Sequence, residues 1–181
     1  VRRRHVLAAL AALQLPLLRA ALAAGSVEKG VARVKGDARI NGAPAKEGMD
    51  VKAGDVVTTG PDGEIVFVID RDAFLVRVNS RVEIQGQKGS LIAAGLRILT
   101  GAVLSVFTPG RPKQVQTATA TIGIRGTAIY VEAETGRTNV CTCYGEAEIA
   151  SAGDPGARET VRTTHHEQPR YVMAMGAPQM L

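Results

Sequence analysis

From residue 27 onward the chain is a series of short β-rich runs separated by Gly, Asp, Asn and Pro. Residues 31–34 alternate apolar and polar side chains, as expected for a half-buried strand, whereas residues 65–69 are continuously apolar, as expected for a strand buried on both faces. Turn residues recur about every 8–12 residues, a spacing typical of β-sandwiches and barrels. The pattern predicts an all-β fold of short, mainly antiparallel strands in a sandwich or a rolled sheet.

The predicted strands are all short runs bounded by turn residues. They cover residues 31–34, 37–40, 56–59, 65–69, 74–78, 82–84, 96–99, 103–107, 114–117, 128–132, 138–143, 147–150, 160–164 and 171–173. The dipeptide Asn41-Gly42 is the strongest short hairpin signal. One segment, residues 90–99, competes as a helix, but its interior Gly95 costs a helix about 1 kcal/mol relative to alanine.

The first 23 residues have a different pattern. The charged stretch Arg2-Arg3-Arg4 precedes an apolar run over residues 6–18, and the small residues of Ala21-Leu22-Ala23 follow. These are the three parts of a secretory signal peptide, and the apolar run is shorter than the roughly 20 residues of a membrane span. We predict a signal peptide over 1–23, export to the periplasm and one β domain over 24–181, with no transmembrane segment in the mature chain.

The composition is that of a globular domain, with 45% hydrophobic and 22% charged residues. The formal charge of +5 comes mainly from the predicted signal peptide, because four of the 22 Lys and Arg residues lie in residues 1–23. The remainder carries 18 basic against 17 acidic side chains. A nearly neutral domain with only 3% aromatic residues gives no reason to expect a nucleic-acid partner.

Several short motifs follow one another in a characteristic order. They are Asn41-Gly42 after Gly36, residues 54–60, residues 70–78 followed by Asn79-Ser80, Gly101-Ala102-Val103, residues 121–127 with Arg125-Gly126-Thr127, and Tyr144-Gly145. Over about residues 30–150 this ordered set resembles the FecR domain family of bacterial envelope proteins. The resemblance implies a periplasmic all-β recognition module.

The best-known branch of that family consists of anti-sigma regulators, which have a cytoplasmic helical domain and a membrane helix before the FecR domain. In this sequence a predicted signal peptide takes the place of those segments. We therefore expect a stand-alone exported FecR-type module that recognises a protein or cell-envelope component, without direct sigma-factor binding.

The motifs also have local physical interpretations. Asp55 can accept backbone hydrogen bonds in a turn, and Asn79-Ser80 can cap another turn. Gly123 and Gly126 bracket Arg125 and permit a tight backbone there. The Arg125 guanidinium then either forms an internal ion pair or strand-end cap, or contacts a partner or ligand.

The sequence contains few groups suited to catalysis. It has no Gly-x-Ser-x-Gly elbow, no phosphate-binding loop and no His-Glu-x-x-His motif. We interpret Asp70 and Asp72 as a solvated hairpin tip rather than a catalytic acid pair. We interpret Glu146 and Glu148 as the solvent-exposed face of a half-buried strand. We therefore expect a protein that is not an enzyme.

Cys141 and Cys143 are two residues apart in a predicted strand, so their sulfurs share one face. A disulfide between them would be strained and easily reduced. The alternatives are a buried pair without function, a redox-active pair, or a metal site in which His165 or His166 joins the thiolates to hold Zn²⁺ or copper. The alternative function is therefore periplasmic metal binding or thiol redox chemistry, and one of the two histidines is expected within side-chain reach of the cysteines.

Overall fold

The structure, a computed structural model, describes residues 29–179, and in that range it contains strands and turns but no helix. The predicted all-β class is therefore confirmed. The predicted signal peptide over 1–23 lies outside the described residues. No helix in the described range is long and apolar enough to cross a membrane.

Residues 29–179 form fourteen strands. They are β1 (Gly30–Lys35), β2 (Ala38–Ile40), β3 (Ala43–Pro44), β4 (Val56–Thr59), β5 (Glu64–Ile69), β6 (Asp72–Val76), β7 (Arg81–Gln85), β8 (Gly95–Val106), β9 (Lys113–Gln116), β10 (Ala120–Ile124), β11 (Ala128–Glu134), β12 (Arg137–Ser151), β13 (Arg158–Thr163) and β14 (Arg170–Met173).

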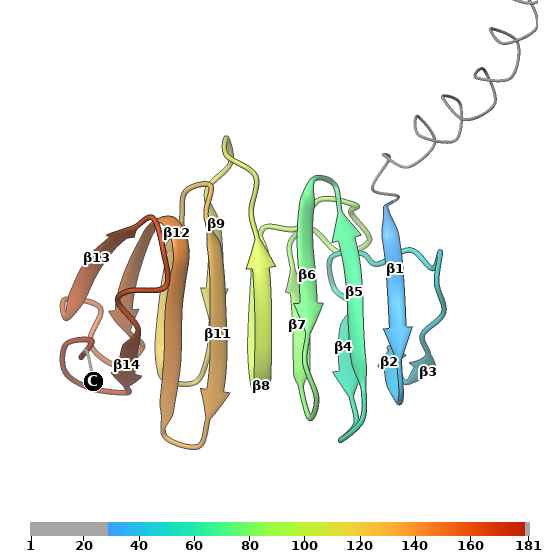
Figure 1. The fold of residues 1–181 in the computed structure, drawn as a ribbon, viewed down its shortest axis with the longest axis horizontal. Coiled ribbons are helices and arrows are strands. Elements are labelled where there is room, and N and C mark those ends of the chain that lie inside the picture. Colours follow the sequence, from blue (N-terminus) through green and yellow to red (C-terminus); the bar gives the residue numbers. More distant parts are fainter. Residues whose placement is uncertain (1–28, 180–181) are drawn as a thin grey trace, which may run out of the picture.

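The strands form two layers that share β8 and β12 (Figure 1). One layer has the order β1-β5-β6-β8-β11-β12-β14, and the other has the order β3-β2-β4-β7-β8-β9-β10-β12-β13. Every pairing is antiparallel except that of β8 with β9. The prediction of mainly antiparallel strands in a sandwich or a rolled sheet is therefore confirmed.

Five strands close on themselves to form a small mixed barrel. The hydrogen-bonded ring runs β8-β9-β10-β12-β11 and returns to β8. Strands β1 to β7 extend this barrel as an open sandwich, which lies to its right in Figure 1. A closed ring has no unpaired edge, so its side chains are held on a rigid support.

The two shared strands each change layers at a glycine. In β8 the residues before Gly101 pair with β7 and those after it pair with β6 and β11. In β12 the residues before Gly145 pair with β11 and those after it pair with β10. The φ angles of these glycines are 81° and 93°, a left-handed conformation that residues with a side chain rarely adopt. These two layer-switching glycines are called the corner glycines below.

The sequence pattern located most strands but not their continuity. The separate predicted runs at 96–99 and 103–107 are one strand, β8, and those at 138–143 and 147–150 are one strand, β12. Strands β3 and β10 were not predicted. Residues 90–94, the start of the competing helix, are a loop.

The turn predictions hold at Asn41-Gly42, which forms the two-residue loop between β2 and β3 with both φ angles positive. The Asp55 carboxylate accepts a backbone hydrogen bond from Lys52 at 2.7 Å, as its turn position suggested. The interior between the layers is one apolar cluster, in which the Phe74 ring contacts the Phe67 and Phe107 rings at centroid distances of 5.2 and 5.6 Å.

Candidate functional site

Arg125 lies directly after β10, in the turn that leads to β11. The next residue, Gly126, has φ 67°, and a Cβ atom built there would lie 2.7 Å from the Pro109 ring. Thr127 is fully buried, and its hydroxyl donates a hydrogen bond to the Tyr144 carbonyl at 2.7 Å. Gly126 and Thr127 are thus required by the turn, and they hold the exposed Arg125 at the surface of the barrel.

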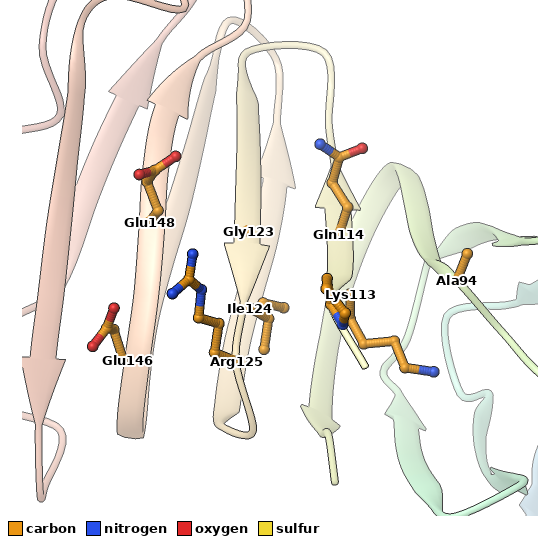
Figure 2. A pocket seen from close by; sticks show the side chains of 9 residues that line it. Ala94, Lys113, Gln114, Gly123, Ile124, Arg125, Glu146 and Glu148 are labelled. Atoms are coloured by element: carbon orange, nitrogen blue, oxygen red, sulfur yellow. The ribbon is translucent and has the colours of Figure 1, made fainter. Parts of the chain in front are cut away.

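A shallow hollow of about 350 Å³ lies beside Arg125 on the outer face of the barrel. Figure 2 shows its polar lining, with Gln114, Glu146 and Glu148 on β9 and β12 and Arg125 at the end of β10. Gly123 pairs with Gln114 on one side and with Glu148 on the other, so bare backbone forms the floor between these two side chains.

The floor is glycine although its backbone does not require one. Gly123 lacks a positive φ angle, and a Cβ atom there would have its nearest neighbours in Glu148 at 3.9 Å. A side chain would therefore fit without strain, and its absence leaves the hollow open. This distinguishes Gly123 from the corner glycines.

The acidic side chains around the hollow already have basic partners. Glu146 accepts a hydrogen bond from Arg162 at 2.6 Å, and Glu148 lies 3.8 Å from Arg158. In residues 29–179 the Arg125 guanidinium forms no ion pair and no hydrogen bond. The internal ion pair considered for Arg125 is absent from this range, and its positive charge is available to a ligand.

The interpretation of Asp72 as part of a solvated hairpin tip is wrong. Its carboxylate is buried, 2.8 Å from the Lys113 ammonium, and it accepts a backbone hydrogen bond from Thr108 at 2.9 Å. Lys113 also donates to the Ala93 carbonyl. The pair connects β6 in one layer to β9 in the other, which the spacing of acidic residues in the sequence could not indicate.

A second group of reactive side chains lies on β12. Across the β11–β12 pairing, Ile129 lies opposite Thr142 and Ala128 opposite Tyr144, so Cys143 is the extra residue of a β-bulge. The bulge reverses which residues face inward, since Val140 and Thr142 are buried before it and Ala147 and Ile149 after it. Glu146 and Glu148 accordingly lie on the outer face, as predicted.

The predicted proximity of a histidine to the cysteines is observed for His166. Its Nδ1 atom lies 3.4 Å from the Cys141 sulfur, and the ligand atoms of Cys141, Cys143 and His166 all lie within 4.8 Å of one another. His165 is outside this group. We call Cys141, Cys143 and His166 the thiol–imidazole group.

The topology brings this histidine to the cysteines. Strand β13 pairs with the second half of β12 and ends opposite Gly145, whereas β14 pairs with the first half and begins opposite Val140. The loop over 164–169 must therefore pass along the β12 residues between them, which include both cysteines. The loop takes this path because β12 is one continuous strand whose first half pairs with β14 and whose second half pairs with β13.

The surroundings of both thiols favour the neutral form over the thiolate. Burial raises the pKa of Cys141 and of Cys143, and the neighbouring Cys141 raises that of Cys143 further. Neither cysteine forms a disulfide. A reactive cysteine nucleophile needs a lowered thiol pKa, whereas the pKa values of Cys141 and Cys143 are raised. Neither cysteine is therefore suited to act as a thiolate nucleophile.

Comparison with known proteins agrees with this architecture. The FecR protein family matches residues 55–148. Two crystal structures of an assigned anti-sigma factor from Parabacteroides distasonis, at 1.65 and 2.50 Å resolution, superpose with a TM-score of 0.55 and 14% sequence identity. Each alignment covers 70% of this chain and 57% of the solved chain, so this chain corresponds to little more than half of that protein. A search among curated proteins gave no match.

Proposed function

Because this chain belongs to the FecR protein family, we propose that it is a binding module that recognises a protein or another cell-envelope component without performing catalysis. The observation that carries the proposal is Arg125, an exposed cation on a rigid barrel with no ion-pair partner in residues 29–179. We call the surface formed by Gln114, Gly123, Arg125, Glu146 and Glu148 the Arg125 face.

The chemistry of this face suits a carboxylate-bearing segment. Arg125 presents a planar guanidinium that can bind a carboxylate through two parallel hydrogen bonds. Gln114 adds an exposed amide that both donates and accepts. The backbone floor at Gly123 lets an extended segment approach closely. A partner with an acidic side chain on an extended stretch would satisfy all three.

The fold relationship supports a protein as the partner. The solved structures of similar fold come from an assigned anti-sigma factor, and anti-sigma factors act by binding another protein. Following the signal-like pattern of residues 1–23, the proposal locates this binding in the periplasm and does not include direct contact with a sigma factor.

Site-directed photo-cross-linking in cells tests the proposal. A photoreactive side chain at Gln114 should yield one discrete adduct with an envelope component. Arg125→Ala should reduce the adduct by about 30-fold or more, since arginines at the centre of an interface contribute about 2 kcal/mol or more. The control Arg39→Ala removes an exposed arginine from β2, at the sandwich end of the molecule, and should leave the adduct unchanged.

Gly123→Val is a second test, which changes the shape of the face and none of its charges. Because the space around the position is open, the variant should fold with wild-type stability, and a strand position favours valine over glycine. It should nevertheless lose the adduct. An adduct that persists in both Arg125→Ala and Gly123→Val would contradict the proposed face.

A further inference from the structure

The thiol–imidazole group has no role in the proposed binding face. Its sulfurs lie on the first half of β12 and its imidazole lies in the loop over 164–169, whereas the Arg125 face uses β9, β10 and the second half of β12. His166 also lies beyond residue 148, where the family match ends. The group therefore calls for an explanation of its own.

The spacing of the three ligand atoms fits a single ion. For Zn²⁺ with bonds of about 2.3 Å to sulfur and about 2.1 Å to nitrogen, tetrahedral geometry separates the sulfur and nitrogen ligands by about 3.6 Å and two sulfurs by about 3.8 Å. The observed distance from the Cys141 sulfur to His166 Nδ1 is 3.4 Å, and all separations are within 4.8 Å. Small side-chain adjustments would bring all three atoms to bonding distance.

The backbone arrangement holds the group together. The bulge at Cys143 directs its sulfur back toward the Cys141 carbonyl, at 3.8 Å, so both sulfurs stay on one side of β12. The loop carrying His166 is fixed at both ends by β13 and β14, and within it the Glu167 amide donates to the His165 carbonyl at 2.8 Å. The three ligands therefore come from elements that pairing already brings side by side.

We propose that Cys141, Cys143 and His166 bind one Zn²⁺ ion, with the fourth coordination position open to solvent. Two thiolates and an imidazole are ligands that zinc prefers, and a three-residue set leaves one position for water or an external ligand. His166 is exposed, so the open position faces solvent. On binding, the ion displaces the two thiol protons, which pass to the solvent.

Metal titration of the full chain under reducing conditions tests the proposal. Apoprotein should bind one equivalent of Zn²⁺ in competition with a chromophoric chelator. Co²⁺, used as a spectroscopic probe, should give a thiolate-to-cobalt absorption band that is lost in Cys141→Ser.

The adjacent histidines provide a matched pair of variants. Both are exposed, so neither substitution should unfold the protein, and circular dichroism checks this directly. His166→Gln should weaken Zn²⁺ binding by about 100-fold or more, because even the loss of a residue that only supports a ligand costs about 10–100-fold. His165→Gln should change it by less than about threefold.

Two results would overturn the proposal. One is an absence of stoichiometric Zn²⁺ binding by the reduced chain, including the case in which only Cu⁺ binds. The other is equal weakening by His165→Gln and His166→Gln, which would indicate a surface histidine pair instead of the thiol–imidazole group. Either result would leave the Arg125 face unaffected, since the cross-linking experiment does not involve these residues.

Discussion

The consecutive residues Arg125, Gly126 and Thr127 have different roles at the end of β10 in the barrel. Gly126 permits a backbone that packs against Pro109, and Thr127 fixes the turn to Tyr144. Within the described range 29–179, the Arg125 side chain forms no hydrogen bond or ion pair with the fold. At the scale of residues, the motif therefore combines two structural positions with one position available for binding.

The buried pair of Asp72 and Lys113 should be the most sensitive polar contact between the layers. Lys113→Met leaves a carboxylate buried without its counter-ion and should lower the free energy of unfolding by about 3–5 kcal/mol. The exposed pair of Lys52 and Asp50, 3.6 Å apart, supplies the control. Lys52→Met should cost less than about 1 kcal/mol. Urea denaturation measures both, and equal effects would show that the buried pair has no special importance.

A pH-dependent contribution should come from Glu159 and Arg170, which join β13 to β14 through two hydrogen bonds of 2.8 and 2.6 Å. These bonds lower the pKa of Glu159 below its ordinary value. The pair therefore stabilises the fold above about pH 4.3, the ordinary glutamate value, and this contribution is lost as pH falls through the lowered pKa.

Glu159→Gln tests this contribution. At pH 7 it should lower the free energy of unfolding by about 1 kcal/mol, because the carboxylate is partly solvated while the Arg170 side chain is only 8% exposed. The difference from wild type should shrink as the pH falls through the lowered pKa of Glu159, because the wild-type carboxylate then becomes protonated. Denaturation curves at pH 7 and pH 3 with the same difference would contradict the assignment.

At the scale of elements, the two long strands turn from one layer to the other by the same device. Each corner glycine lies against a hydroxyl side chain that binds the adjoining backbone. Ser80 accepts a hydrogen bond from the Ala102 amide at 3.0 Å beside Gly101, and Thr127 donates to the Tyr144 carbonyl beside Gly145. The short motifs that resemble the FecR family thus include both corners.

Gly101→Ala should therefore be strongly destabilising. A Cβ atom there would lie 2.6 Å from the Ser80 Cα atom, in addition to the strain of a left-handed conformation. We expect a loss of about 3 kcal/mol or more in the free energy of unfolding. Gly136 has nearly the same φ angle but no atom within 4 Å of its Cβ position. Gly136→Ala should cost about 1 kcal/mol, and an equal cost at both positions would exclude a steric role for the corner.

The alternation of side chains was sufficient to predict most strands, because burial on one face leaves a period of two. It could not show that β8 and β12 are continuous, since a corner glycine looks like a turn residue in the sequence. It also missed β10, whose Ile122-Gly123-Ile124 alternation is interrupted by a glycine. The hollow over Gly123 could not be predicted from the sequence either, because its lining depends on the register of β9, β10 and β12.

At the scale of the whole molecule, the residues that could be named in advance were those whose role is local. Arg125 stood out between glycines, and the two cysteines stood out by their spacing. The choice between His165 and His166, and the partnership of Asp72 with Lys113, depend on which strands cross between layers. Such long-range contacts follow from topology, which strand patterns alone do not determine.

Residues 29–179 therefore form an open sandwich that continues into a closed barrel, and one apolar cluster fills the interior of both. The Arg125 face lies on the barrel, where the closed ring restricts backbone motion. The thiol–imidazole group lies where the C-terminal strands β13 and β14 flank β12. The two sites use different side chains, although the loop over 164–169 that carries His166 also borders Arg125, since Arg125 and Glu167 line one hollow.

Chemical-shift mapping with the component captured by cross-linking is the most direct test of the central claim, which is that this FecR-family chain binds its partner through the Arg125 face. The account predicts that backbone amide shifts change around Gln114, Gly123 and Arg125, and that Arg125→Ala abolishes the changes. Shift changes centred on β1 to β4, or changes that persist in the variant, would contradict it.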